Sequence, residues 1–134
     1  MTIRQTLAAG LMLLAAPVAA QDSGPDIVTG QQLFERHCAV CHGATGEGDG
    51  PLAPALTLQP VDLTALSVDG VFPGQRILSR IDGRDPLVSH GSPMPVYGEF
   101  FDGPEITMKL PSGQPLIAPE AMVHLMAWIE SIQD

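Results

Sequence analysis

Apolar side chains recur every three or four residues in three stretches of the chain, which predicts three amphipathic helices. The first stretch follows Asp26, a residue type that caps helices, and continues until about residues 41–43. The second covers residues 74–81 after Pro73, which suits the first turn of a helix. The third follows Pro119 and continues to the end of the chain. This pattern predicts a mostly helical domain.

The last stretch has the clearest division into two faces. One face carries large apolar side chains and should pack against the rest of the domain. The other face is polar, so His124 on it is expected to be solvated. The apolar face consists of Met122, Leu125, Met126, Trp128, Ile129 and Ile132, and the opposite face of Glu120, His124, Ala127 and Ser131.

Between the helices the pattern changes. Residues 105–116 alternate between apolar and polar types, which predicts a two-stranded hairpin that turns at residues 111–113. Residues 43–60 and 85–98 are rich in glycine and proline and are expected to be loops, with a short turn at residues 62–66. The chain holds 14 glycines and 13 prolines among 134 residues. A small domain with so many loops needs an additional group to pack around.

Residues 1–20 have the pattern of a secretory signal peptide. Arg4 gives a basic start, an apolar run of about ten residues follows, and small residues precede a cleavage site after Ala20. The run is too short for the roughly 20 residues that cross a bilayer, so we expect export to the periplasm and no integral membrane segment in the mature chain. An uncleaved anchor is the alternative. The expected mature domain is residues 21–134, with no second domain and no internal repeat.

The charge of the mature chain narrows the possible partners. The full chain has 6 lysines and arginines against 15 acidic residues. Cleavage would remove Arg4 and leave a net charge of about −10. Such a surface repels nucleic acid and favours partners with a basic docking surface.

The strongest chemical signal is Cys38-Ala39-Val40-Cys41-His42, a C-x-x-C-H motif. Two thiols at this spacing can each add to one vinyl group of a single porphyrin, and the histidine then presents an imidazole to the iron. A redox-active C-x-x-C would follow a strand in a βαβ unit, which the sequence does not predict. A structural zinc site needs a second pair of ligands, and the chain has only 2 cysteines.

These residues resemble a known family. Residues 26–134 are similar to class I bacterial cytochromes c, with G-x-x-L-F-x-x-x-C-x-x-C-H-G at residues 30–43 and M-P at residues 94–95. Residues 46–51 resemble the subset with a G-x-G-D-G-P loop, which occurs in bacterial respiratory chains.

The resemblance implies one covalent haem c and a small cytochrome c-like fold in which the N- and C-terminal helices cross. Gly30 and Phe34 would then pack against Trp128. It also implies that the carbonyl oxygen of Pro51 accepts a hydrogen bond from the second ring nitrogen of His42, with Pro54 as the alternative acceptor.

The family uses a methionine downstream of the motif as the sixth iron ligand, and this chain offers several. We expect Met94, because Pro93 and Pro95 restrict the backbone around it. Met122 and Met126 lie on the apolar face of the last helix and Met108 in the expected hairpin, where thioethers commonly fill the core. His90 is the rival ligand and would give a bis-histidine haem.

The expected metal ligands are therefore His42 and Met94, and no catalytic residue is assigned. The expected function is that of a periplasmic single-electron carrier and not of an enzyme, with redox proteins as partners. One alternative is the haem subunit of a respiratory or dehydrogenase complex. Another is a haem enzyme or gas-ligand sensor with an open distal position. One of the three arginines at positions 76, 80 and 84 is expected to neutralise a haem propionate.

Overall fold

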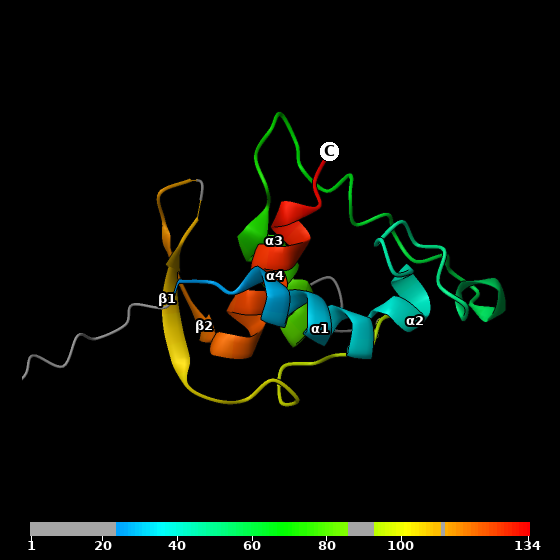
Figure 1. The fold of residues 1–134 in the computed structure, drawn as a ribbon, viewed down its shortest axis with the longest axis horizontal. Coiled ribbons are helices and arrows are strands. Elements are labelled where there is room, and N and C mark those ends of the chain that lie inside the picture. Colours follow the sequence, from blue (N-terminus) through cyan, green and yellow to red (C-terminus); the bar gives the residue numbers. More distant parts are fainter. Residues whose placement is uncertain (1–23, 86–92, 111) are drawn as a thin grey trace, which may run out of the picture.

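The computed structural model describes residues 24–85, 93–110 and 112–134, and every structural statement below concerns these residues. These residues form four α-helices and one two-stranded sheet, which are drawn in Figure 1. The expected signal peptide falls outside this part of the chain. In chain order the elements are α1 (Ile27–His37), α2 (Ala39–His42), the 3-10 turn η1 (Ala53–Ala55), α3 (Gly74–Asp82), β1 (Glu105–Lys109), β2 (Pro115–Pro119) and α4 (Glu120–Ser131).

The first expected helix is present but is divided in two. Asp26 caps α1 as predicted, since its side chain accepts a hydrogen bond from the backbone N–H of Val28. The helix then breaks at Cys38, and the short α2 follows. The N–H of Cys38 still donates to the carbonyl oxygen of Phe34 at 2.8 Å, and its own carbonyl accepts from the N–H of His42 at 2.9 Å. The break therefore reorients the motif without leaving these groups unpaired.

Helices α1 and α4 pack directly against each other, as expected. A Cβ atom placed on Gly30 would lie 2.0 Å from the carbonyl oxygen of His124 and 2.9 Å from the Cβ of Trp128. Only glycine permits this approach of the two backbones. One turn further, the rings of Phe34 and Trp128 have centroids 4.1 Å apart. The crossing of the terminal helices is thus confirmed, and it explains a glycine in the middle of α1.

His124 corrects one expectation. It is buried rather than solvated, with 8% of its surface exposed. Its Nδ1 accepts a hydrogen bond of 2.9 Å from the backbone N–H of Asp26, and its Nε2 lies 3.6 Å from Glu120. The start of α1 covers the face of α4 that the pattern left exposed, so the histidine serves as a polar link between the two helices.

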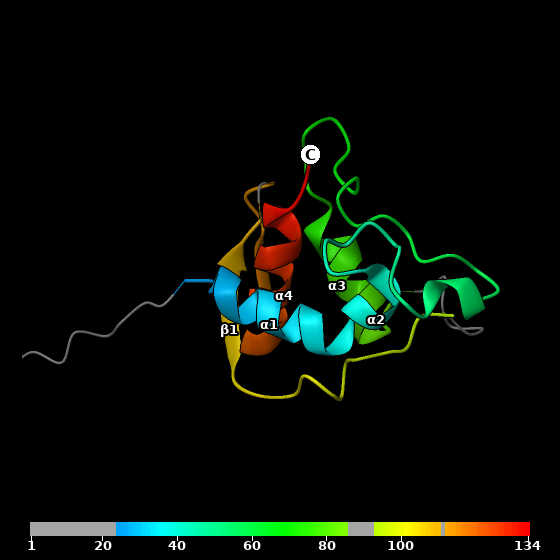
Figure 2. The ribbon, with the colours of Figure 1, turned by 45° about the vertical axis from the view of Figure 1, so that its right-hand side comes forward.

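The remaining elements complete the core around α4. The expected hairpin is present, with β1 and β2 antiparallel and Thr107 opposite Ile117. The second strand extends beyond the expected end at residue 116, to Pro119. Figures 1 and 2 show this hairpin on one side of α4, with α2 and the loop after it on the other side. Helix α3 lies where predicted and ends at Gly83, whose φ of 83° is left-handed.

One hydrophobic core joins α1, α3, α4 and both strands, and Ala39 of α2 packs against it. Six large side chains in it are almost fully inaccessible, and four of the six come from α4. Within the described residues, no helix has both the length and the apolar character to cross a membrane. The six side chains are Phe34, Leu78, Met122, Val123, Leu125 and Met126.

Candidate functional site

The two cysteines lie at the junction of α1 and α2 and within α2. Both are free thiols and both are partly buried. Burial, with a smaller effect from the charge of Cys41, raises the pKa of the Cys38 thiol to about 11. Cys38 follows a helix, whereas a thioredoxin-type cysteine follows a strand. The local structure therefore does not have the arrangement of a thioredoxin-type redox site.

His42 ends α2, and its ring has one hydrogen-bond partner among the described residues. The residue is 8% exposed, and its Nδ1 lies 3.1 Å from the carbonyl oxygen of Val61. Because a carbonyl oxygen only accepts, Nδ1 carries the proton and Nε2 keeps a free electron pair. Burial lowers the pKa of His42, and the hydrogen bond to Val61 opposes that effect. The ring is thus a neutral imidazole in the tautomer that a metal ion requires.

This hydrogen bond corrects the expected acceptor. The carbonyl of Val61, rather than that of Pro51 or Pro54, faces Nδ1 of His42. Pro51 and Pro54 both have exposed side chains in the turn that leads into and through η1. The loop continues past both prolines and returns to the histidine ten residues after Pro51. The resemblance had indicated the right kind of interaction but assigned it to the wrong residue.

The loop that follows the motif is fastened to α2 through its backbone. Three carbonyl groups at the end of α2, which have no partner within a short helix, accept hydrogen bonds from N–H groups of the loop. The close approach requires Gly50, where a Cβ atom would lie 2.6 Å from the carbonyl of Cys41. The three bonds run from Gly48 to His42 (2.8 Å), from Gly50 to Cys41 (3.1 Å) and from Leu52 to Val40 (2.9 Å).

The second expected ligand, Met94, lies in a separate segment. Its side chain is partly buried and packs against the hydrophobic core. The same segment is fixed a few residues later by Tyr97, whose N–H donates to the carbonyl oxygen of Ile81 at 2.8 Å. A Cβ atom on Gly98 would lie 2.5 Å from the carbonyl oxygen of Asp82, so the segment lies close against the end of α3.

Tyr97 also connects this segment to the motif. Its hydroxyl donates a hydrogen bond of 3.0 Å to the carbonyl oxygen of His37, the residue before Cys38. Phe101 stacks on Tyr97, with centroids 5.7 Å apart, and Phe100 meets His37 edge-on at 4.7 Å. Burial raises the pKa of Tyr97, and the nearby cysteines raise it further, so the hydroxyl keeps its proton at neutral pH.

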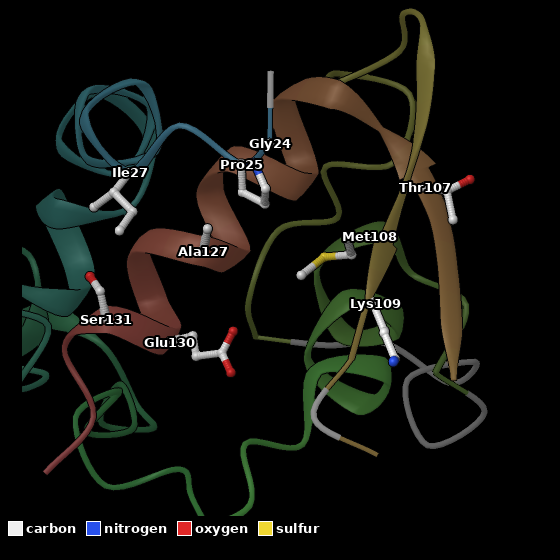
Figure 3. Close-up of a pocket in the computed structure, with 9 residues that line it drawn as sticks. All are labelled: Gly24, Pro25, Ile27, Thr107, Met108, Lys109, Ala127, Glu130 and Ser131. Carbon is white, nitrogen blue, oxygen red and sulfur yellow. The ribbon is translucent and has the colours of Figure 1, made fainter. Parts of the chain in front are cut away.

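The other methionines have structural positions. Met122 and Met126 are inaccessible within the core, and Met108 is 8% exposed on β1. Figure 3 shows Met108 beside a groove of about 540 Å³ between β1, α4 and the start of α1. No residue of the C-x-x-C-H motif lines this groove. The rival ligand His90 lies outside the described residues.

Two of the three arginines named as candidates for the propionates form ion pairs with acidic residues. Arg80 lies 3.6 Å from Asp85, and Arg84 pairs with Asp82 at the end of α3. For Arg76 the structure gives no indication of a role.

The residues present fit a covalently attached haem. Two free thiols flank one turn of helix, and the neutral imidazole that follows has one nitrogen fixed by the backbone and the other available. When bound, haem c supplies an iron that exchanges one electron between its ferric and ferrous states. The fold and this site together define a haem-binding domain of the c type.

The comparison with known families agrees with this assignment. The family model described as Cytochrome c matches residues 27–133, almost the whole described chain. The chain therefore belongs to the cytochrome c family, with one covalent haem c on Cys38 and Cys41 and a role in haem-based electron transfer. No curated protein and no solved structure matches the chain.

Proposed function

We propose that this chain is an exported, periplasmic carrier of single electrons, with His42 and Met94 as the two axial ligands of its haem. The observation that carries the proposal is the hydrogen bond from the Tyr97 hydroxyl to the carbonyl of His37. It fastens the segment of Met94 to the end of the helix from which the attachment motif begins. The two ligand-bearing segments are thereby joined independently of the haem.

Saturated coordination is what makes such a protein a carrier. A neutral imidazole and a thioether that both remain bound change little between the two oxidation states, and they leave no position for a substrate. Both ligand segments are anchored, His42 through Val61 and the Met94 segment through Tyr97. This arrangement favours electron transfer over an enzyme or gas sensor with an open iron.

The location and subset are part of the same proposal. The basic start, short apolar run and small residues of positions 1–20 support export and cleavage after Ala20. The G-x-G-D-G-P sequence at residues 46–51 supports a place in the bacterial class I subset. The mature domain would then be residues 21–134.

The first experiment tests attachment and coordination. The chain is expressed with a periplasmic haem-maturation system, and its haem is extracted with acidic acetone. We expect the haem to stay with the protein, the oxidised form to show the weak near-infrared band of sulfur bound to ferric iron, and the ferrous form to bind carbon monoxide poorly. Freely extracted haem contradicts covalent attachment. Rapid binding of carbon monoxide contradicts the carrier role.

The partner follows from the charge. A mature chain with a net charge of about −10 attracts a basic docking surface, and salt screens this attraction beyond about 8 Å at physiological ionic strength. We expect electron exchange with a basic redox protein to slow as salt is added, when stopped-flow rates are followed at a series of ionic strengths. A rate that is flat or rises with salt would mean that a local apolar surface governs docking.

A further inference from the structure

The side chain of Gln133 forms five hydrogen bonds with other described residues. Its Oε1 accepts from the N–H groups of Leu66 and Ser67, at 3.0 and 2.9 Å, and from the hydroxyl of Ser67 at 3.2 Å. Its Nε2 donates to the carbonyl oxygens of Leu63, at 2.6 Å, and Ile129, at 2.8 Å. One amide at the end of the chain thus binds the end of α4 to a loop almost 70 residues earlier.

The loop held in this way is the one that carries the acceptor for the proximal histidine. Val61 lies two residues before Leu63, whose N–H also donates to the carbonyl of Gly46 at 2.7 Å. On the other side of Val61, Pro60 lies against Gly48, where a Cβ atom would be 2.5 Å from the Pro60 carbonyl oxygen. The Val61 carbonyl is therefore fixed between two anchored neighbours.

We propose that Gln133 is a positioning residue for His42: by holding Leu63 it keeps the carbonyl of Val61 within hydrogen-bond distance of the imidazole. The inference rests on the proposed role of His42 as an iron ligand. A hydrogen bond from Nδ1–H to a carbonyl makes the imidazole a stronger electron donor and so favours ferric iron. Weakening that bond raises the midpoint potential.

Substitutions that remove different atoms of the Gln133 amide can distinguish a role in positioning His42 from a purely structural role at the end of α4. Glutamate at position 133 keeps the oxygen that accepts from Leu66 and Ser67 but loses both bonds donated by Nε2. Leucine loses all five bonds. Because the bond donated to Leu63 is the one nearest to Val61 along the chain, Gln133→Glu and Gln133→Leu should disturb the histidine to a similar extent, although they destabilise the fold unequally.

The experiment compares Gln133→Leu and Gln133→Glu with Ser131→Ala. The control removes a hydrogen bond of 2.7 Å from the Ser131 hydroxyl to the carbonyl of Trp128, at the same end of α4, and leaves the loop intact. Three quantities are measured on the holoproteins: the midpoint potential, the exchange rate of the His42 Nδ1 proton by NMR, and the melting temperature.

We expect both substitutions of Gln133 to raise the potential and to speed exchange of the His42 proton about tenfold, the equivalent of one ordinary hydrogen bond. Ser131→Ala should change neither. A lower melting temperature with an unchanged midpoint potential and an unchanged exchange rate of the His42 Nδ1 proton would show that Gln133 only stabilises the fold. That result would overturn the inference. An unchanged Gln133→Glu variant would overturn it as well, even if Gln133→Leu fails to fold.

The same measurements separate this inference from the function on which it rests. If the unsubstituted protein carries no covalent haem, the proposed carrier function and the inference on Gln133 are both wrong. If it carries haem with His42 bound, and the variants leave the histidine unaltered, the carrier function stands and only the role of Gln133 is wrong.

Discussion

The two segments that carry or support the expected haem ligands are held in different ways. Residues 43–68, on the side of His42, are fixed mainly by backbone hydrogen bonds and by glycines that lie against other backbone. Residues 93–101, on the side of Met94, have fewer such anchors among the described residues, the backbone hydrogen bond from Tyr97 to Ile81 and the contact of Gly98 with Asp82, and they depend more on the side chains of Tyr97 and its aromatic neighbours. A loop that is held by many backbone contacts opens as one unit, whereas individual side-chain contacts can be lost one at a time. Ligand exchange should therefore occur on the Met94 side.

The most direct way to break this comparison is to remove Met94. Met94→Ala should abolish the near-infrared band, lower the midpoint potential and open the iron to carbon monoxide, because a thioether favours ferrous iron and blocks the sixth position. Absorption spectroscopy and redox titration of the purified holoprotein measure all three effects.

Met108→Ala is the matched control, since Met108 fills the hairpin side of the core and lies beside no residue of the motif. It should lower stability and leave the spectrum unchanged. If Met94→Ala keeps the band, or if His90→Ala removes six-coordination, the ligand on this side has been assigned to the wrong residue.

On the His42 side the largest effect is expected from Gly48→Ala. Gly48 has a φ of 84°, and its Cβ would press on the carbonyl of Pro60, so the backbone next to Val61 must move. We expect a loss of about 3 kcal/mol in the free energy of unfolding, together with faster exchange of the His42 Nδ1 proton. Denaturant unfolding and NMR measure the two effects.

Gly70 provides the control for backbone strain. It has a φ of 72°, but a Cβ atom there would meet nothing within 4 Å. Gly70→Ala should cost about 1 kcal/mol and leave His42 unaltered. An equal loss of unfolding free energy in Gly48→Ala and Gly70→Ala would show that the contact with Pro60 contributes nothing.

These contrasts also indicate why the sequence predicted some features and missed others. The helices and the hairpin followed from periodicity, caps and turn residues, which depend on neighbouring residues, and the packing of Gly30 against Trp128 was implied by the family resemblance. The acceptor for His42 did not, because every residue has a backbone carbonyl and only the path of the loop selects Val61. Gln133 was missed for a related reason: it lies just beyond the apolar stripe of α4, where a polar residue is ordinarily solvated.

Cys38, at the junction of α1 and α2, gives a test that depends on pH. With Cys41→Ser as the background, the remaining thiol of the haem-free chain is alkylated across a range of pH. Burial is the larger cause of the pKa of about 11 in the fold and remains in this variant, so the rate should keep rising until about that pH. In urea the burial is lost and the rate should level off near the ordinary pKa of about 8.5.

At neutral pH the native chain should therefore react about 300-fold more slowly than the unfolded chain, because the pKa of the thiol falls from about 11 in the fold to about 8.5 on unfolding. The sign follows from the cause, since burial favours the protonated thiol. Identical profiles in buffer and in urea would show that this packing does not persist without haem.

The smallest expected effect sharpens the comparison on the Met94 side. Tyr97→Phe removes the hydrogen bond to the carbonyl of His37 but keeps the ring against Phe101, so it should cost about 1 kcal/mol and speed the binding of imidazole to ferric iron about fivefold. Phe100→Leu is the control, because Phe100 is 61% exposed and meets His37 only by its ring edge. Stopped-flow binding measures the rate, and NMR follows the Nδ1 proton of His42, which should stay unchanged in both variants. An equal acceleration by Phe100→Leu, or a disturbed His42 proton in Tyr97→Phe, would mean that the two segments are not anchored independently.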